Sequence, residues 1–197
     1  MSRLGRGYPN IALARRTPGV SPVLYDAVGA GATASSGTSI SWSHTATAGA
    51  WVFACAETLG DTLTTATYGG TAMTAIANIG TGYAVYGLPN APGGAKTVVV
   101  NKSGSTHSMG GNSVSYLNVR SLGAVISSTS VTSETVSVLP LGMTLAWIIG
   151  AALSSGGTSR WTNSTSTPKT IADSVGSTTY VASASAAFIG FALNPLP

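Results

Sequence analysis

The stretch LGMTLAWIIGAAL, residues 141–153, is the most apolar run in the chain and decides between a membrane helix and a buried strand. It is well short of the ~20 residues that a membrane-spanning helix needs, so no membrane insertion is expected. We interpret it as a buried strand, in which Gly150 permits a bend or bulge near the end. In a sandwich the opposite sheet covers one face of such a strand, and this strand is apolar enough for both faces to be covered.

A second stretch, AWVFACAET at residues 50–58, fits the same interpretation. Period-two spacing places Trp51, Phe53 and Cys55 on one side of a strand, where a thiol packs as a small hydrophobic group. Cys55 is the only cysteine, so no intrachain disulfide can form and the fold must be stabilised by packing. We therefore expect Cys55 in the core.

Alternation and glycine turns extend the strand pattern along the chain. In TSISWSHT, Ile40, Trp42 and His44 face one way and the serines face the other. TATYGGTAMTAIANI predicts a hairpin, because Gly69 and Gly70 can adopt the positive φ angles that tight turns require. The further predicted strands are 23–28, 82–88, 95–102, 111–119, 122–127, 134–140, 143–151, 178–185 and 186–193.

About eleven short strands at this spacing, with no amphipathic helical segment, predict an all-β fold. We expect an antiparallel two-sheet β-sandwich, jelly-roll-like, forming a single domain over residues 23–197. Residues 29–37 are expected to be a flexible connection. Residues 162–179, which are rich in Thr and Ser, are expected to be a long loop across one end of the sandwich.

Residues 1–22 differ from the rest and predict an extended, basic, Pro-containing arm. The arm contains four of the nine basic residues and no acid, whereas the body from residue 21 onward balances five bases with five acids. Arginines can bind carboxylates of a neighbouring subunit, and a proline-stiffened segment loses less freedom on docking. The residues expected to make this assembly contact are Arg3, Arg6, Tyr8, Pro9, Arg15 and Arg16.

The charge distribution also limits the classes of partner that the body, residues 23–197, can bind. Its bases are scattered singly, without the basic face and interleaved aromatics of a nucleic-acid binder, so no nucleic acid is expected. Charged residues make up 7% of the chain, against roughly a quarter in typical soluble domains. Such low charge gives little repulsion between copies, and favours a protein that lives inside an assembly.

Catalytic and metal-binding patterns are scarce, and we expect no enzyme, no metal and no cofactor. Glu57 and Asp61 are the only carboxylates close in sequence, and we interpret them as solvated loop acids, with a glycosidase-like pair as the alternative. His44 and His107 are the only imidazoles, which gives no zinc spacing. No calcium-binding run or GxSxG motif occurs, and the SxxK match ending at Lys169 is expected by chance in a Ser/Thr-rich chain.

Sandwich modules can bind sugars on exposed aromatics, and several aromatic residues of this chain lie outside the clear core. Most lie at alternating strand positions, where core or interface packing explains them equally well. The candidates are Tyr83, Tyr86, Tyr116, Trp161 and Tyr180. Arg160 and Trp161, beside the long polar loop, are the candidate glycan or partner contact, although surface packing is the favoured interpretation of Trp161.

Three stretches together resemble a β-sandwich domain that is common in tailed-phage virion proteins. They are the YGGTAMT hairpin at Tyr68–Thr74, the pair YGLPNAPGGAKTVVV at Tyr86–Val100, and SVSYLNV at Ser113–Val119. The closing AAFIGFALNP resembles the last strand of that domain, and LGRGYPN at Leu4–Asn10 resembles the start of small minor tail proteins of actinobacterial phages. The chain departs from the family pattern at Asn118, where Gly is frequent, and at NAP in place of NPP.

The resemblance implies a non-enzymatic structural protein located in the virion, most simply a minor tail protein that is made in the host cytoplasm. Its partners would be other virion proteins, with the chain a homo-oligomer in a symmetric assembly. A capsid decoration protein, or a module that binds a host-surface carbohydrate, are the alternatives. Tail and capsid locations are not separated by the sequence.

Overall fold

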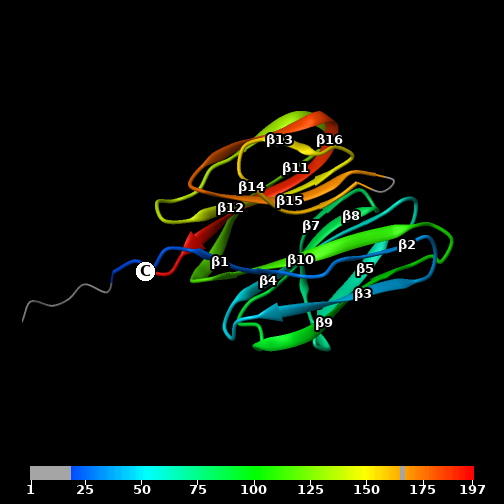
Figure 1. The fold of residues 1–197 in the computed structure, drawn as a ribbon, viewed down its shortest axis with the longest axis horizontal. Coiled ribbons are helices and arrows are strands. Elements are labelled where there is room, and N and C mark those ends of the chain that lie inside the picture. The colour runs from blue at the N-terminus through cyan, green and yellow to red at the C-terminus, as the bar shows by residue number, and fades with distance from the viewer. Residues whose placement is uncertain (1–18, 165–166) are drawn as a thin grey trace, which may run out of the picture.

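The computed structural model describes residues 19–164 and 167–197 (Figure 1). The described residues form strands and turns without a helix, and every strand pair is antiparallel. A helix able to cross a membrane is accordingly missing from this part of the chain. The predicted residues of the arm, from Arg3 to Arg16, lie outside the described residues.

The strands form three sheets instead of the two expected. The central sheet contains β1 (Leu24–Val28), β2 (Ala32–Ala34), β4 (Trp51–Thr58), β7 (Thr74–Ile79), β8 (Tyr83–Leu88) and β10 (Met109–Leu117). The small sheet contains β3 (Ser39–Ala46), β5 (Leu63–Tyr68), β6 (Thr71–Ala72) and β9 (Gly94–Lys102). The curled sheet contains β11 (Val119–Val136), β12 (Met143–Ile149), β13 (Leu153–Ser155), β14 (Thr158–Asn163), β15 (Lys169–Val175) and β16 (Thr178–Pro195).

The central sheet lies between the other two, and strand β4 shows why (Figure 1). Phe53 and Cys55 pack into the layer shared with the curled sheet. Val52 and Ala54, on the opposite face, pack against the small sheet. Both faces are therefore apolar, and all of β4 after Trp51 is buried. The predicted sandwich class is confirmed, and the alternation in β4 serves two cores instead of one.

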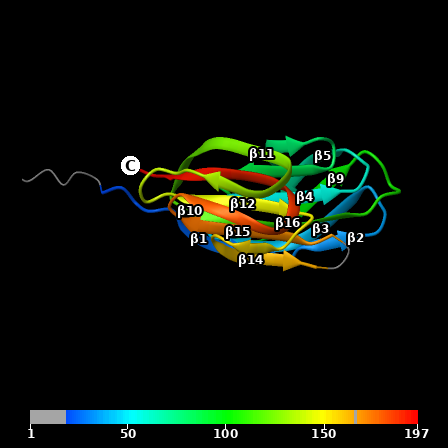
Figure 2. The same cartoon turned by 90° about the horizontal axis from the view of Figure 1, so that it is seen from above.

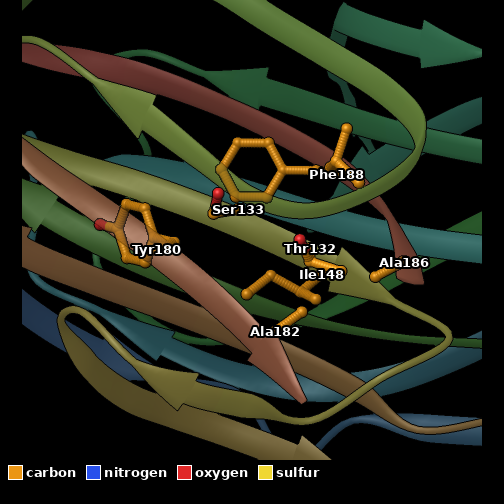
Figure 3. Close-up of a pocket in the computed structure, with 8 residues that line it drawn as sticks. Thr132, Ser133, Ile148, Tyr180, Ala182, Ala186 and Phe188 are labelled. Carbon is orange, nitrogen blue, oxygen red and sulfur yellow. The ribbon is translucent and has the colours of Figure 1, made fainter. Parts of the chain in front are cut away.

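The curled sheet covers its own outer face. The long strands β11 and β16 bend, so that their paired ends at Ser133 and Val181 fold over β12. Figure 3 shows Tyr180, Phe188 and Ile148 gathered under this fold. The cavity that they line has a volume of about 10 Å³, which holds about one water molecule at most. This layer is packing and offers no room for a ligand.

Several strand predictions are confirmed in detail. The inward positions of β3 alternate with exposed serines and threonine, and His44 is buried among them. Gly69 and Gly70 form the turn between β5 and β6 with φ angles of 57° and 83°. β12 ends at Ile149, and the next residue, Gly150, has a φ of 100°.

Two predicted loops are wrong. The connection at 29–37 contains the short strand β2, which pairs with β10. The expected loop at 162–179 contains β15, a fully paired strand between β12 and β14. β15 was not predicted because two of its three inward residues, Lys169 and Asp173, are charged, and only Ile171 is apolar. Ion pairs with residues of other strands allow both charges to be buried.

Phe53 tests the importance of the layer between the central and curled sheets. Its ring lies 5.3 Å from Phe191 and 5.6 Å from Trp51, centroid to centroid. Phe53→Ala should lower the free energy of unfolding by about 3–5 kcal/mol, because the cavity cannot fill. Val175→Ala, at a side chain that is 77% exposed, should change it by about 0.5 kcal/mol or less. Urea unfolding of both variants measures the difference, and similar small losses would contradict this packing.

Candidate functional site

The two ends of the sandwich differ in chemistry. At the terminal end, defined by the pairing of Ser21 with Leu196, the described chain begins and ends (Figure 2). At the opposite, distal end, β4 finishes at Thr58 and β15 begins at Lys169. Strand β4 has 8 residues, so the ends are separated by about 25 Å at ~3.3 Å per residue.

Exposed aliphatic side chains gather at the terminal end. They come from the chain entering β1, the turn between β11 and β12, the end of β15 and the last residues. These residues, the apolar end from here on, are Val20, Leu24, Leu139, Leu141, Val175 and Leu196. Backbone pairing of Ser21 with Leu196, and of Val23 with Leu141, brings their segments together, and exposed apolar groups that cluster on a surface mark interaction sites.

Leu141 is held in an unfavourable backbone conformation within the apolar end. Its φ is 65°, a left-handed value that costs a bulky residue about 1–2 kcal/mol. The carbonyl of Leu141 accepts a 3.0 Å hydrogen bond from the Val23 amide, which fixes the turn against the chain entering β1. The side chain remains 50% exposed, so the strain is not repaid by burial.

The distal end carries a pocket of about 380 Å³ with a buried ion pair in its wall. Lys169 Nζ lies 2.8 Å from Glu57 Oε1, and the two side chains are 2% and 3% exposed. Around them are hydroxyl-bearing and apolar residues from β2, the β4–β5 turn and the start of β10. The complete lining is Thr33, Ala34, Ser35, Glu57, Leu59, Ser108, Met109 and Lys169.

Glu57 is only partly satisfied in this pocket. Its second oxygen, Oε2, is buried and has no hydrogen-bond partner among residues 19–164 and 167–197. Such an orphaned acceptor costs about 1–3 kcal/mol, and more when it is charged. The Nε1 of Trp147, Oγ1 of Thr170 and Oδ1 of Asp173 are also buried without partners, but none of these residues lines this pocket. Among the described residues, Glu57 is thus the residue of this pocket wall that has an orphaned side-chain acceptor.

A second depression adjoins this pocket and shares Leu59 as a wall. It has a volume of about 450 Å³, and its lining includes Tyr83, Thr58, Thr81 and Thr129. Tyr83 is the cross-strand partner of Glu57 in the β4–β8 pair, so the two depressions lie side by side. Of the predicted aromatic candidates, Tyr83 and Trp161 are half-buried, while Tyr86, Tyr116 and Tyr180 are buried.

The interpretation of Glu57 and Asp61 as two solvated loop acids is wrong. Glu57 is buried against Lys169, and Asp61 accepts a hydrogen bond from Lys102, whose side chain is also buried. Lys102 holds the pKa of Asp61 below its usual value, with His107 acting in the same direction. Each carboxylate is committed to its own cation, which leaves them poorly arranged as an acid pair.

The candidate contact residues Arg160 and Trp161 have internal partners on β14. Arg160 Nε donates a 2.8 Å hydrogen bond to Asp173, and its guanidinium lies 3.9 Å from the centroid of the Tyr25 ring. Trp161 stacks on Trp147 at 6.1 Å. These contacts give both residues a packing role between sheets, at a distance along β15 from the Glu57 pocket.

A buried chain of hydrogen bonds joins the small and central sheets around His44. Trp42 Nε1 donates to Ser113 Oγ at 2.8 Å, and Ser113 Oγ lies 2.8 Å from His44 Nδ1. His44 Nε2 lies 3.0 Å from Ser115 Oγ, which donates to Asp26 at 2.7 Å. Because Ser115 donates to the carboxylate, it must accept from Nε2, so Nε2 carries the proton and Nδ1 accepts from Ser113. Every donor in this series of hydrogen bonds, from Trp42 to Ser115, points toward Asp26.

This order does not make a catalytic triad. In a triad the carboxylate orients the histidine, which in turn accepts the proton of the nucleophilic serine. Here Asp26 contacts Ser115, and burial lowers the pKa of His44 from 6.5 to about 4, partly offset by Asp26. The imidazole is therefore neutral at pH 7. Burial likewise raises the pKa of the Cys55 thiol, as expected for a core residue and unlike a nucleophile.

No cluster of three or more His, Cys, Asp or Glu side chains within residues 19–164 and 167–197 could hold a metal ion. No protein-family model, curated protein or solved structure matches this chain. The Glu57 pocket and the His44 chain were not found from the sequence, because their members come from strands far apart. The one available signal was His44 on the apolar side of its strand.

The His44 chain predicts acid sensitivity. Because the folded-state pKa of His44 is depressed, the unfolded state binds the proton first as pH falls from 6.5 to about 4. Over that window the free energy of unfolding should fall by about 3 kcal/mol, and it should recover on return to neutral pH. His44→Gln should flatten this part of the stability profile, whereas His107→Gln should retain it. Urea unfolding between pH 4 and 7 measures this, and an unchanged slope in His44→Gln would contradict it.

Proposed function

We propose that this chain is a non-enzymatic structural protein of a tailed-phage virion, most simply a minor tail protein docked through its N-terminal arm and the apolar end. The observation that carries the proposal is the apolar end itself. Val20 and Leu24, where the chain emerges from the arm, lie beside Leu141 and Leu196. Residues 19–22 of the predicted arm thus lie at the apolar end, which would let the arm and the apolar end contribute to one docking region.

The body's charge distribution supports an assembly role. Three of its ion pairs are wholly or partly buried: Lys102–Asp61, Arg160–Asp173 and Lys169–Glu57. Ionised groups that satisfy one another internally leave a surface of hydroxyls and small side chains. Such a surface provides little electrostatic repulsion between neighbours, and suits packing within a particle.

The occupant that fits the docking region is a neighbouring virion subunit with an apolar patch flanked by carboxylates. Leucine and valine side chains of the apolar end would lie against that patch. The four arginines of the arm, with no acid among them, would bind the carboxylates. A capsid decoration protein would use the same region to dock on the head. Location of the chain on the tail or on the head of the particle distinguishes a minor tail protein from a decoration protein.

Deleting residues 1–20 should leave a folded domain that no longer enters particles. The described core starts at Val23, so the thermal midpoint should shift by only a few degrees. Immunogold labelling of purified particles, with antibody against the body, measures incorporation. Label on the tail for the full chain and none for the truncated chain is expected. Label on the head would favour decoration, and normal incorporation of the truncated chain would contradict docking by the arm.

Leu141→Gly should separate docking from stability. Glycine relieves the left-handed strain, so the free energy of unfolding should rise by about 0.5–1 kcal/mol while incorporation falls. Leu59→Gly is the matched control at the distal end, with a side chain that is 42% exposed. It should lose about 0.5–1 kcal/mol and still incorporate. Equal incorporation of the two variants would contradict a docking role for the apolar end.

A further inference from the structure

We infer that the distal end binds a neutral oligosaccharide, with one sugar ring in the Glu57 pocket and the next ring toward Tyr83. Sugar binding here does not require the virion role, because it depends only on the pocket. Both depressions open at the end of the sandwich opposite the apolar end, so docking would leave them accessible.

The orphaned oxygen of Glu57 specifies the kind of group that the ligand must offer. Among the described residues, Oε2 is a buried acceptor without a donor in the pocket wall, so a ligand hydroxyl or amide hydrogen that displaces the wall beside Glu57 would satisfy it. Lys169 neutralises the carboxylate at 2.8 Å, and the pair has no net charge. A cation would be repelled by Lys169 and an anion by Glu57, which leaves a neutral hydroxyl-rich molecule as the best match.

The rest of the lining suits a sugar ring, which alternates hydroxyls with a C–H face. Thr33, Ser35 and Ser108 are the hydroxyl-bearing residues of the lining, and Leu59 is its exposed apolar residue. A volume of about 380 Å³ falls in the roughly 300–1,000 Å³ range of small-molecule sites. The neighbouring depression, at about 450 Å³, adds the half-buried ring of Tyr83 and room for a second sugar.

This site replaces Arg160 and Trp161 as the candidate glycan contact. Those side chains are held by Asp173, Tyr25 and Trp147, and neither lines the distal depressions. Glu57, by contrast, combines burial, an orphaned acceptor and a pocket of sufficient size at one position.

The test measures binding of neutral trisaccharides to the full chain by ligand-observed NMR and by titration. The panel contains trisaccharides of glucose, galactose, mannose, rhamnose and N-acetylglucosamine. At least one should bind with a dissociation constant of about 1 mM or tighter. Inorganic phosphate, as an anionic probe, should not compete. Failure of every sugar in the panel, or binding of phosphate alone, would overturn the inference.

Two variants place the binding at the pocket. Thr33→Trp should fill the opening from an exposed position on β2, and Thr71→Trp is its control at an exposed position on β6. The double variant Glu57→Leu with Lys169→Met removes both charges together, so that neither is left buried and unpaired. Thr33→Trp and the double variant should weaken binding by about tenfold or more, and Thr71→Trp should not. Equal affinity in all variants would locate the sugar elsewhere and overturn the inference.

Discussion

The fold depends on burial of both faces of the central sheet. Strands β4 and β10 have no solvent-facing side except near their ends, so their inward groups are apolar or depend on partners within the fold. Phe53 fills the wide layer toward the curled sheet, while Ala54 keeps the small sheet close. Ser113 and Ser115, which cannot reach water from β10, are satisfied by the chain through His44. The polar exceptions therefore form defined networks.

Period-two spacing in the sequence was enough to predict the sandwich class and the burial of Cys55, and the glycine pair was enough to predict the turn at Gly69. It could not reveal a third sheet, because alternation shows which side chains share a face and does not show what covers each face. β15 was missed for a related reason. Lys169 and Asp173 lie at inward positions that become tolerable only when Glu57 and Arg160 arrive from other strands. Ion pairs between strands leave no pattern in the local sequence, so the distal pocket, whose wall contains one of them, could not be predicted either.

The proposed docking and sugar-binding roles occupy opposite ends of the same strands. Leu141 is held in a strained turn at one end, and Glu57 has an orphaned oxygen at the other. Both are local departures from the best folded state, and such departures concentrate where a protein meets a partner. Between them lies a neutral, tightly packed body that fixes their separation. A rigid spacer of this kind would hold a sugar-binding face away from the particle surface.

The pairing of Ser21 with Leu196 has a consequence for joining copies in series. Because the chain enters and leaves the sandwich side by side, a short connection from residue 197 to residue 19 of a second copy would join two bodies by the same end and leave both distal faces free. A branched or repeating ligand long enough to reach both distal faces could then bind them at once. Such two-site binding gives avidity without a new contact between the bodies.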